Sequence, residues 1–123
     1  MFIDAINFRI RKAEKKASTT IGNTELIAVS KKQDDYKIDR AIECGQVFFG
    51  ENRVQEAIER WEDRIKHNKD LQIRLIGPLQ TNKVKQALKL FDIIETLDRE
   101  KLAKEISISI NDQTKTNSFY IQV

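Results

Sequence analysis

Short apolar runs alternate with segments of helical periodicity along most of this chain, and this alternation restricts its fold more than any other feature. The runs are expected as strands near 25–30, 46–49, 71–76, 92–96 and 118–123. Apolar residues at helical spacing occupy the intervening segments. Strands that alternate with helices build a parallel sheet covered by those helices. The sequence therefore predicts an α/β fold.

Several helices follow from the same pattern. A leading helix is expected from residue 2 to about 19, with one apolar face made of Ile3, Ile6, Ile10, Ala13 and Ala17. Further helices are expected at 36–44, from Val54 to Ile65, and after Asn82 and Asp98. Gly45 is a typical helix C-terminal residue, because glycine accepts the left-handed conformation. Asn52 and Asp98 are predicted as N-caps.

Length and composition limit the class of protein. A chain of 123 residues suits one domain, so we treat 1–123 as a single unit. The net charge of +3 argues only weakly for an anionic partner. No apolar stretch approaches membrane-spanning length, so no membrane partner is expected. The single Cys44 suits a reducing compartment, which predicts a cytoplasmic protein with this thiol buried.

The leading helix also carries a basic side, made of Arg9, Arg11, Lys12, Lys15 and Lys16. This side is compatible with contact to nucleic acid or to a membrane surface. A face that is simply solvated, the usual role of such charge on a helix, is the better interpretation. We expect the solvated face, and no nucleic-acid partner.

Polar residues stand where the predicted strands end. Lys31 ends the first run, and the others are Glu51, Asn52, Gln80 to Asn82, Thr96 and Asp98. The carboxyl ends of parallel strands meet at one edge, where α/β proteins bind ligands. A lysine beside apolar walls there favours its neutral amine, which attacks aldehydes to form Schiff bases.

Other roles for these residues stay open at this point. Lys31 also fits a lysine that marks the exit of a strand into solvent, and Asn52 and Asp98 also fit simple caps. His67 is the only histidine and lies in a polar segment, so neither a Ser-His-Asp triad nor a metal site is expected. We assign no catalytic residue.

Three ordered blocks resemble one known family. They are Ala28-Val29-Ser30-Lys31, Phe49-Gly50-Glu51-Asn52-Arg53-Val54-Gln55-Glu56 and Ile76-Gly77-Pro78-Leu79-Gln80-Thr81-Asn82-Lys83, with a weaker match at Ile94-Glu95-Thr96-Leu97-Asp98. The chain resembles the pyridoxal phosphate homeostasis protein family, itself similar to the N-terminal domain of alanine racemase (fold-type III). The resemblance implies a TIM barrel in which Lys31 carries pyridoxal 5'-phosphate (PLP) as an internal aldimine and Asn52 lies beside the cofactor.

The resemblance further implies a PLP-binding protein of intracellular vitamin B6 homeostasis that is not an enzyme. A PLP-dependent amino-acid racemase is the enzymatic alternative, but it needs a second acid or base opposite the aldimine, and the sequence identifies none. A second alternative is a split-gene fragment that acts only with a companion chain.

Length is the main departure from the family. Family members are longer, and this chain reaches only the fifth of a TIM barrel's eight strands. We therefore expect a barrel truncated to about the first five βα units. Its phosphate-binding loops normally follow strands seven and eight, so weak PLP binding is expected from the chain alone. A companion C-terminal fragment or self-association is the expected protein partner.

Overall fold

Five strands lie side by side in the order β1-β2-β3-β4-β5, and each pairing is parallel. The computed structural model describes residues 2–123. The strands are β1 (Ala28–Val29), β2 (Phe48–Glu51), β3 (Gln72–Leu75), β4 (Ile93–Leu97) and β5 (Ser118–Ile121). The predicted parallel α/β sheet is confirmed. Strand β1 is shorter than predicted, and β2 extends two residues further along the chain than predicted.

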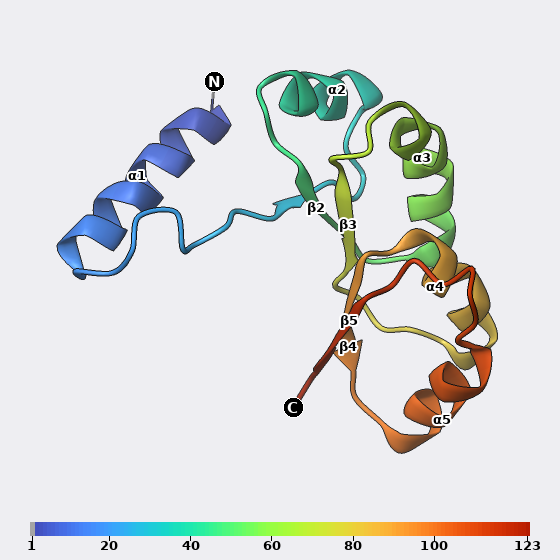
Figure 1. The fold of residues 1–123 in the computed structure, drawn as a ribbon. Helices are drawn as coiled ribbons and strands as arrows, with labels where there is room; N and C mark the ends of the chain where they lie inside the picture. The colour runs from blue at the N-terminus through green and yellow to red at the C-terminus, as the bar shows by residue number, and fades with distance from the viewer. Residues whose placement is uncertain (1) are drawn as a thin grey trace.

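The helices separate into two groups. They are α1 (Phe2–Lys16), α2 (Asp35–Glu43), α3 (Val54–His67), the 3-10 turn η1 (Thr81–Lys83), α4 (Val84–Leu90) and α5 (Glu100–Ser109). Figure 1 shows α2 to α5 along one face of the sheet, whereas α1 stands apart on the other side, beyond β1. We call the face opposite α2–α5 the open face.

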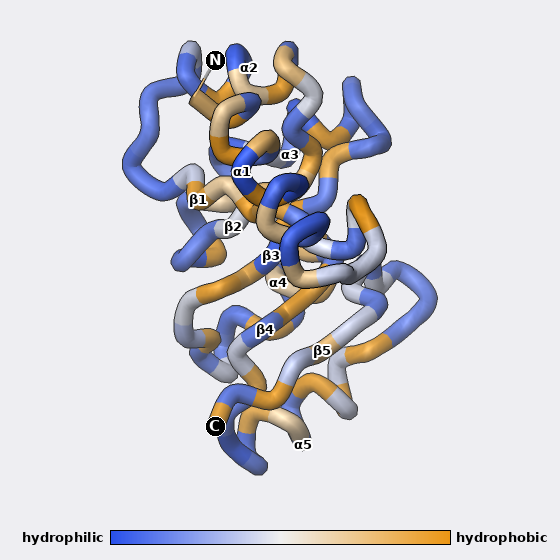
Figure 2. The backbone as a smooth tube through the Cα atoms, turned by 90° about the vertical axis from the view of Figure 1, so that its left-hand side faces the viewer, coloured by the Kyte–Doolittle hydropathy of each residue, from blue (hydrophilic) through white to orange (hydrophobic). Residues whose placement is uncertain are grey.

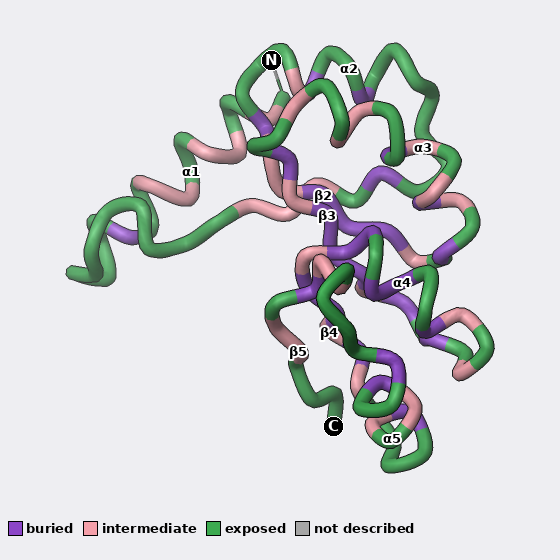
Figure 3. The backbone as a smooth tube through the Cα atoms, turned by 45° about the vertical axis from the view of Figure 1, so that its right-hand side comes forward, coloured by how far each residue is buried: buried purple, intermediate pink, exposed green. Residues whose placement is uncertain are grey.

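The hydrophobic core lies between the sheet and α2–α5. Phe49, Ile73 and Ile94 point from the strands into it and are almost fully buried. Trp61 of α3 is 0% exposed and its ring centroid lies 4.6 Å from that of Phe49. Buried segments accordingly gather where β2 and β3 meet α3 and α4 (Figure 3), and hydrophobic stretches follow the strands, β4 in particular (Figure 2).

Helix α1 does not bury the apolar face that its sequence predicts. Ile3, Ile6 and Ile10 are only half-buried, while Ala13 and Ala17 are exposed. The buried residue of this helix is instead Glu14. Its Oε1 accepts hydrogen bonds from Arg11 Nη1 (2.6 Å) and the Gly22 amide (3.1 Å), and its Oε2 accepts one from the Thr24 amide (2.7 Å). Glu14 thereby closes the turn that follows α1.

These bonds set the charge state of Glu14. The Arg11 hydrogen bond is the largest cause that lowers the pKa of this carboxyl, and the amides add to it against the opposing effect of burial. The pKa falls from 4.5 to about 2. A depressed folded-state pKa stabilises the folded form above pH 4.5, and this contribution is lost as the pH falls toward about 2.

We therefore expect Glu14→Gln to raise the exchange rate of the Gly22 and Thr24 amides at neutral pH. The difference from the parent chain should shrink as the pH falls from 4.5 to about 2, because the parent carboxyl then becomes protonated as well. Hydrogen exchange followed by NMR measures this, with the exposed Glu43→Gln as control. A difference of constant size across this pH range would contradict the prediction.

Three local predictions are wrong. Helix α3 has Arg53, not Asn52, as its N-cap, and α5 has Arg99, not Asp98; no cap side chain bonds the helix at either. Because β2 stays extended through Glu51, Asn52 belongs to the connecting loop. Cys44 is exposed rather than buried. Gly45 does take the predicted left-handed conformation, at φ 94°, directly after Cys44, the C-cap of α2.

Candidate functional site

The sheet register brings the predicted site residues to one edge. Val29 aligns with Gly50, and Gly50 aligns with Arg74. Since all strands run in the same direction, their carboxyl ends form a single edge, which we call the carboxyl edge. Lys31 and Asn52 follow β1 and β2 at this edge. The residues just before them, Ser30 and Glu51, are joined by a hydrogen bond of 2.7 Å between Ser30 Oγ and Glu51 Oε2.

Lys31 lies in a turn that begins at Ser30. The Gln33 amide donates to the Ser30 carbonyl over 3.2 Å and closes this turn. Lys31 and Lys32 occupy its two central positions and both are exposed. The expected apolar walls around Lys31 are therefore not found, because strand β1 ends at Val29 and the chain leaves the core before it reaches the lysine.

Asn52 lies in a tightly packed part of the carboxyl edge. It is half-buried and lines a hollow of about 590 Å³ together with Arg53, Val54, Gln55, Pro78, Gln80 and Lys83. Gly77 approaches its backbone so closely that a Cβ at Gly77 would lie 2.3 Å from the Asn52 carbonyl oxygen. Thr96 Oγ1 in turn donates to the Gly77 carbonyl over 2.8 Å. Gly77 therefore packs against the chain after β2 at Asn52 and is hydrogen-bonded to β4 through Thr96.

The other predicted strand-end residues lie at the rim. Gln80 precedes η1 and is exposed, as are Asn82 and Asp98. Asp98 accepts a hydrogen bond from Arg99 Nη1 (2.7 Å), and Arg99 Nη2 donates to the Leu79 carbonyl over 2.7 Å. These contacts fix the loop after β3 against the loop after β4.

Glu51 has a larger role than its place at a strand end suggested. It is 0% exposed, and both of its carboxylate oxygens accept a hydrogen bond of 2.8 Å from Arg60 Nη1. Its Oε2 also accepts one of 2.8 Å from Trp61 Nε1, in addition to the one from Ser30. We call Glu51 a hub because three residues donate hydrogen bonds to its carboxylate. The sequence signal for it is a carboxylate directly after the apolar run that ends at Gly50. Its partners are visible only in the fold.

The open face of the sheet also carries polar groups. Ile94 points into the core, so Glu95, the next residue of the strand, points away from it. Arg74 lies with its guanidinium 5.7 Å from the Phe48 ring centre and 3.5 Å from Glu25. Within residues 2–123, Arg74 Nε and Glu95 Oε2 are buried atoms without a hydrogen-bond partner.

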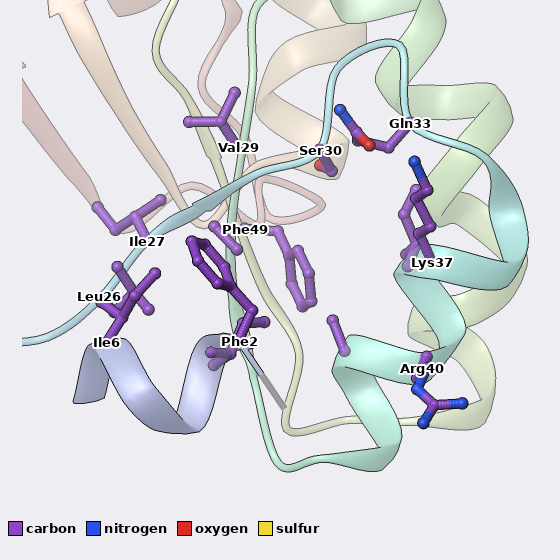
Figure 4. A pocket seen from close by; sticks show the side chains of 14 residues that line it. Phe2, Ile6, Leu26, Ile27, Val29, Ser30, Gln33, Lys37, Arg40 and Phe49 are labelled. Carbon is purple, nitrogen blue, oxygen red and sulfur yellow. The ribbon is translucent and has the colours of Figure 1, made fainter. Parts of the chain in front are cut away.

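A second hollow, of about 520 Å³, lies beside β1 rather than at the carboxyl edge. Figure 4 shows Phe2 and Ile6 of α1 near Leu26, Ile27 and Phe49, with Ser30 and Gln33 further along the wall. Its lining is mostly apolar, and neither Lys31 nor Asn52 belongs to it. It therefore borders the turn at Lys31 without containing the predicted site.

Among residues 2–123, no three His, Cys, Asp or Glu side chains are grouped so as to hold a metal ion. Within the same residues, no helix has the length and apolar character needed to cross a membrane.

Comparison with proteins of known sequence connects this geometry to a family. No protein-family model matches the chain. The pyridoxal phosphate homeostasis protein of Vibrio cholerae is 36% identical over 107 residues, which cover 85% of this chain and 45% of that protein. The protein of the same name from Haemophilus influenzae is 35% identical over 121 residues, covering 98% of this chain and 49% of that protein.

The chain is a relative of the pyridoxal phosphate homeostasis proteins. It spans about half the length of the curated relatives it matches. Two solved structures agree with this relationship. PipY of Synechococcus elongatus, solved with PLP bound, is 37% identical with a TM-score of 0.67, over 80% of this chain and 46% of PipY. A protein of unknown function from Bifidobacterium adolescentis is 31% identical with a TM-score of 0.78, over 86% of this chain and 47% of that protein.

Proposed function

We propose that this chain binds PLP and belongs to a protein of intracellular vitamin B6 homeostasis. In this proposal Lys31 bonds covalently to the cofactor and Asn52 lies beside it. The main support is the likeness to PipY, a structure solved with PLP bound, at 37% identity. The names of the curated relatives support the homeostasis role.

The residues at the carboxyl edge fit this cofactor. PLP supplies an aldehyde, with which a neutral lysine amine condenses as water leaves. Lys31 is exposed, so its amine is within reach of an aldehyde in solution. Ser30 and Glu51 direct their side chains toward the helices. Lys31 and Asn52 directly follow these two residues at the carboxyl edge, and we propose that both face the cofactor there.

We propose that residues 1–123 form one domain equivalent to the first five βα units of a TIM barrel, which the neighbour-to-neighbour strand order supports. A role without catalytic turnover is supported by relatives named for homeostasis rather than for a reaction. A cytoplasmic location stays a prediction.

Association with a companion chain or with a second copy also stays a prediction. Among residues 2–123, strands β1 and β5 each pair on one side only, so further strands have two places to add. Sedimentation of the purified chain, alone and with a C-terminal half of a relative, distinguishes these two partners.

The proposal is tested by locating the cofactor on the chain. Purified protein is mixed with PLP, reduced with borohydride and digested, and the labelled lysine is identified by mass spectrometry. We expect the pyridoxyl group on Lys31, no such product in Lys31→Ala, and an unchanged yield in Lys32→Ala. Equal labelling of many exposed lysines, or labelling that survives Lys31→Ala, would overturn the proposal.

A further inference from the structure

Two lysines at the carboxyl edge carry an amine that can react with an aldehyde. Lys31 and Lys32 are adjacent, exposed and in one turn, so accessibility does not distinguish them. The conformation of the turn from Ser30 to Gln33 decides whether the amine of Lys31 or that of Lys32 points toward the open face. What holds this turn therefore determines which lysine is selected.

The turn contains an unfavourable backbone conformation. Lys32 has φ 57°, which lies in the left-handed region that residues other than glycine adopt infrequently. Such a conformation persists where the surroundings fix it on both sides. Lys32 is exposed, so it has little packing of its own, and the restraint has to come from the ends of the turn.

Ser30 supplies the restraint at the first end. It is 3% exposed, and its amide donates to the Gly50 carbonyl over 3.1 Å. Its carbonyl accepts the Gln33 amide, and its hydroxyl donates to Glu51 Oε2 over 2.7 Å. Ser30 is therefore held through its backbone and its side chain together.

Glu51 is in turn held from the helix layer. Arg60 and Trp61 of α3 bind its carboxylate at 2.8 Å, and the side chain is 0% exposed. A charged carboxylate that is fixed by two donors forms a strong and directional acceptor for a third one. Helix α3 and the turn are thus connected by hydrogen bonds through the Glu51 carboxylate.

We propose that Glu51 is a positioning residue that acts through Ser30 to orient the turn so that Lys31, and not Lys32, receives the aldehyde. This inference rests on the proposed PLP-binding function and adds to it the origin of lysine selection. A purely structural Glu51 would tie α3 to β2 and leave the choice between the two lysines unaffected. The two roles therefore differ in a measurable ratio.

The test uses the full chain and the variant Ser30→Ala, which removes the hydroxyl but leaves Arg60 and Trp61 on Glu51. The control is Ser109→Ala on α5, which removes a buried serine hydroxyl whose partner, Glu105 Oε1, is likewise a carboxylate oxygen (3.4 Å). After PLP and borohydride, Ser30→Ala should lower the Lys31 to Lys32 labelling ratio about tenfold, the order of one charge-assisted hydrogen bond. Ser109→Ala should leave the ratio unchanged.

A second measurement needs no cofactor. Exchange of the Gln33 amide reports closure of the turn, and Ser30→Ala should speed it about tenfold while Ser109→Ala does not. If neither lysine is labelled in the parent chain but Gln33 exchange responds, the proposed function fails and the restraint on the turn stands. An unchanged ratio, or unchanged Gln33 exchange, in Ser30→Ala would overturn the inference.

Discussion

Replacing Glu51 with alanine is expected to lower the free energy of unfolding by about 3–5 kcal/mol, the usual cost of removing one partner of a buried ion pair. The Arg60 side chain is 14% exposed, so its guanidinium loses its carboxylate in a place that water reaches poorly. The indole N–H of Trp61, which is 0% exposed, loses its acceptor as well. Urea unfolding followed by Trp61 fluorescence measures the change.

The matched control is Glu56→Ala on α3, the helix that carries Arg60 and Trp61. Glu56 contacts Arg53 at 4.0 Å in a pair whose side chains are 38% and 78% exposed. Exposed pairs of this kind contribute at most about 1 kcal/mol, so we expect little change. A loss of less than about 1 kcal/mol in Glu51→Ala would show that water replaces the carboxylate and that Glu51 is not the hub of this region.

Gly77→Ala is expected to destabilise the chain by at least about 1–3 kcal/mol, the typical cost of overpacking a close-packed region. The new Cβ would meet three backbone atoms of Asn52, at 2.3, 2.8 and 2.9 Å. Backbone cannot rotate away as a side chain does, so the loop between β2 and α3 has to move. We also expect weaker PLP retention, because Asn52 moves with this loop.

Gly50→Ala separates this effect from the mere loss of a glycine. A Cβ at Gly50 would meet Ile76 Cδ1 at 3.0 Å and Ile27 Cγ2 at 3.2 Å, which are the ends of side chains that adjust. An alanine within a strand also costs less backbone entropy than glycine, by roughly 0.5–1 kcal/mol. We expect urea unfolding to place Gly50→Ala near the parent chain; equal losses in both variants would show that backbone contact at Asn52 is not the cause.

The strands were predictable because their signal is local. Each run near β2, β3 and β4 contains apolar residues that can be buried, consecutive in some and alternating with polar residues in others, and each is followed by a helical pattern. Alternation of the two leads directly to parallel pairing. Strand β1 retained only Ala28 and Val29 of its predicted range, since Val29 is 47% exposed and this part of the chain borders α1 and the turn rather than the centre of the core.

The helix ends and α1 were less predictable. Asn52 and Asp98 are residue types that commonly cap helices. Each helix nevertheless begins one residue too late for them to be its N-cap, because Asn52 and Asp98 still belong to the connections that follow β2 and β4. The isoleucines of α1 have helical spacing, yet a periodic pattern does not tell which element covers the apolar face of the helix. Only the tertiary structure shows that this helix stands apart and that Glu14 is its buried residue.

The sequence alone determined the fold class, the strand order along the chain and the position of Lys31 and Asn52 at strand ends. Each of these features depends on residues that are close to one another in the chain. The convergence of Ser30, Arg60 and Trp61 on Glu51, the contact of Gly77 with Asn52 and the exposure of Lys31 were decided by the tertiary structure. Hydrogen-bond partners and solvent access are set by elements packed from distant parts of the chain, and local periodicity carries no information about which of those elements meet.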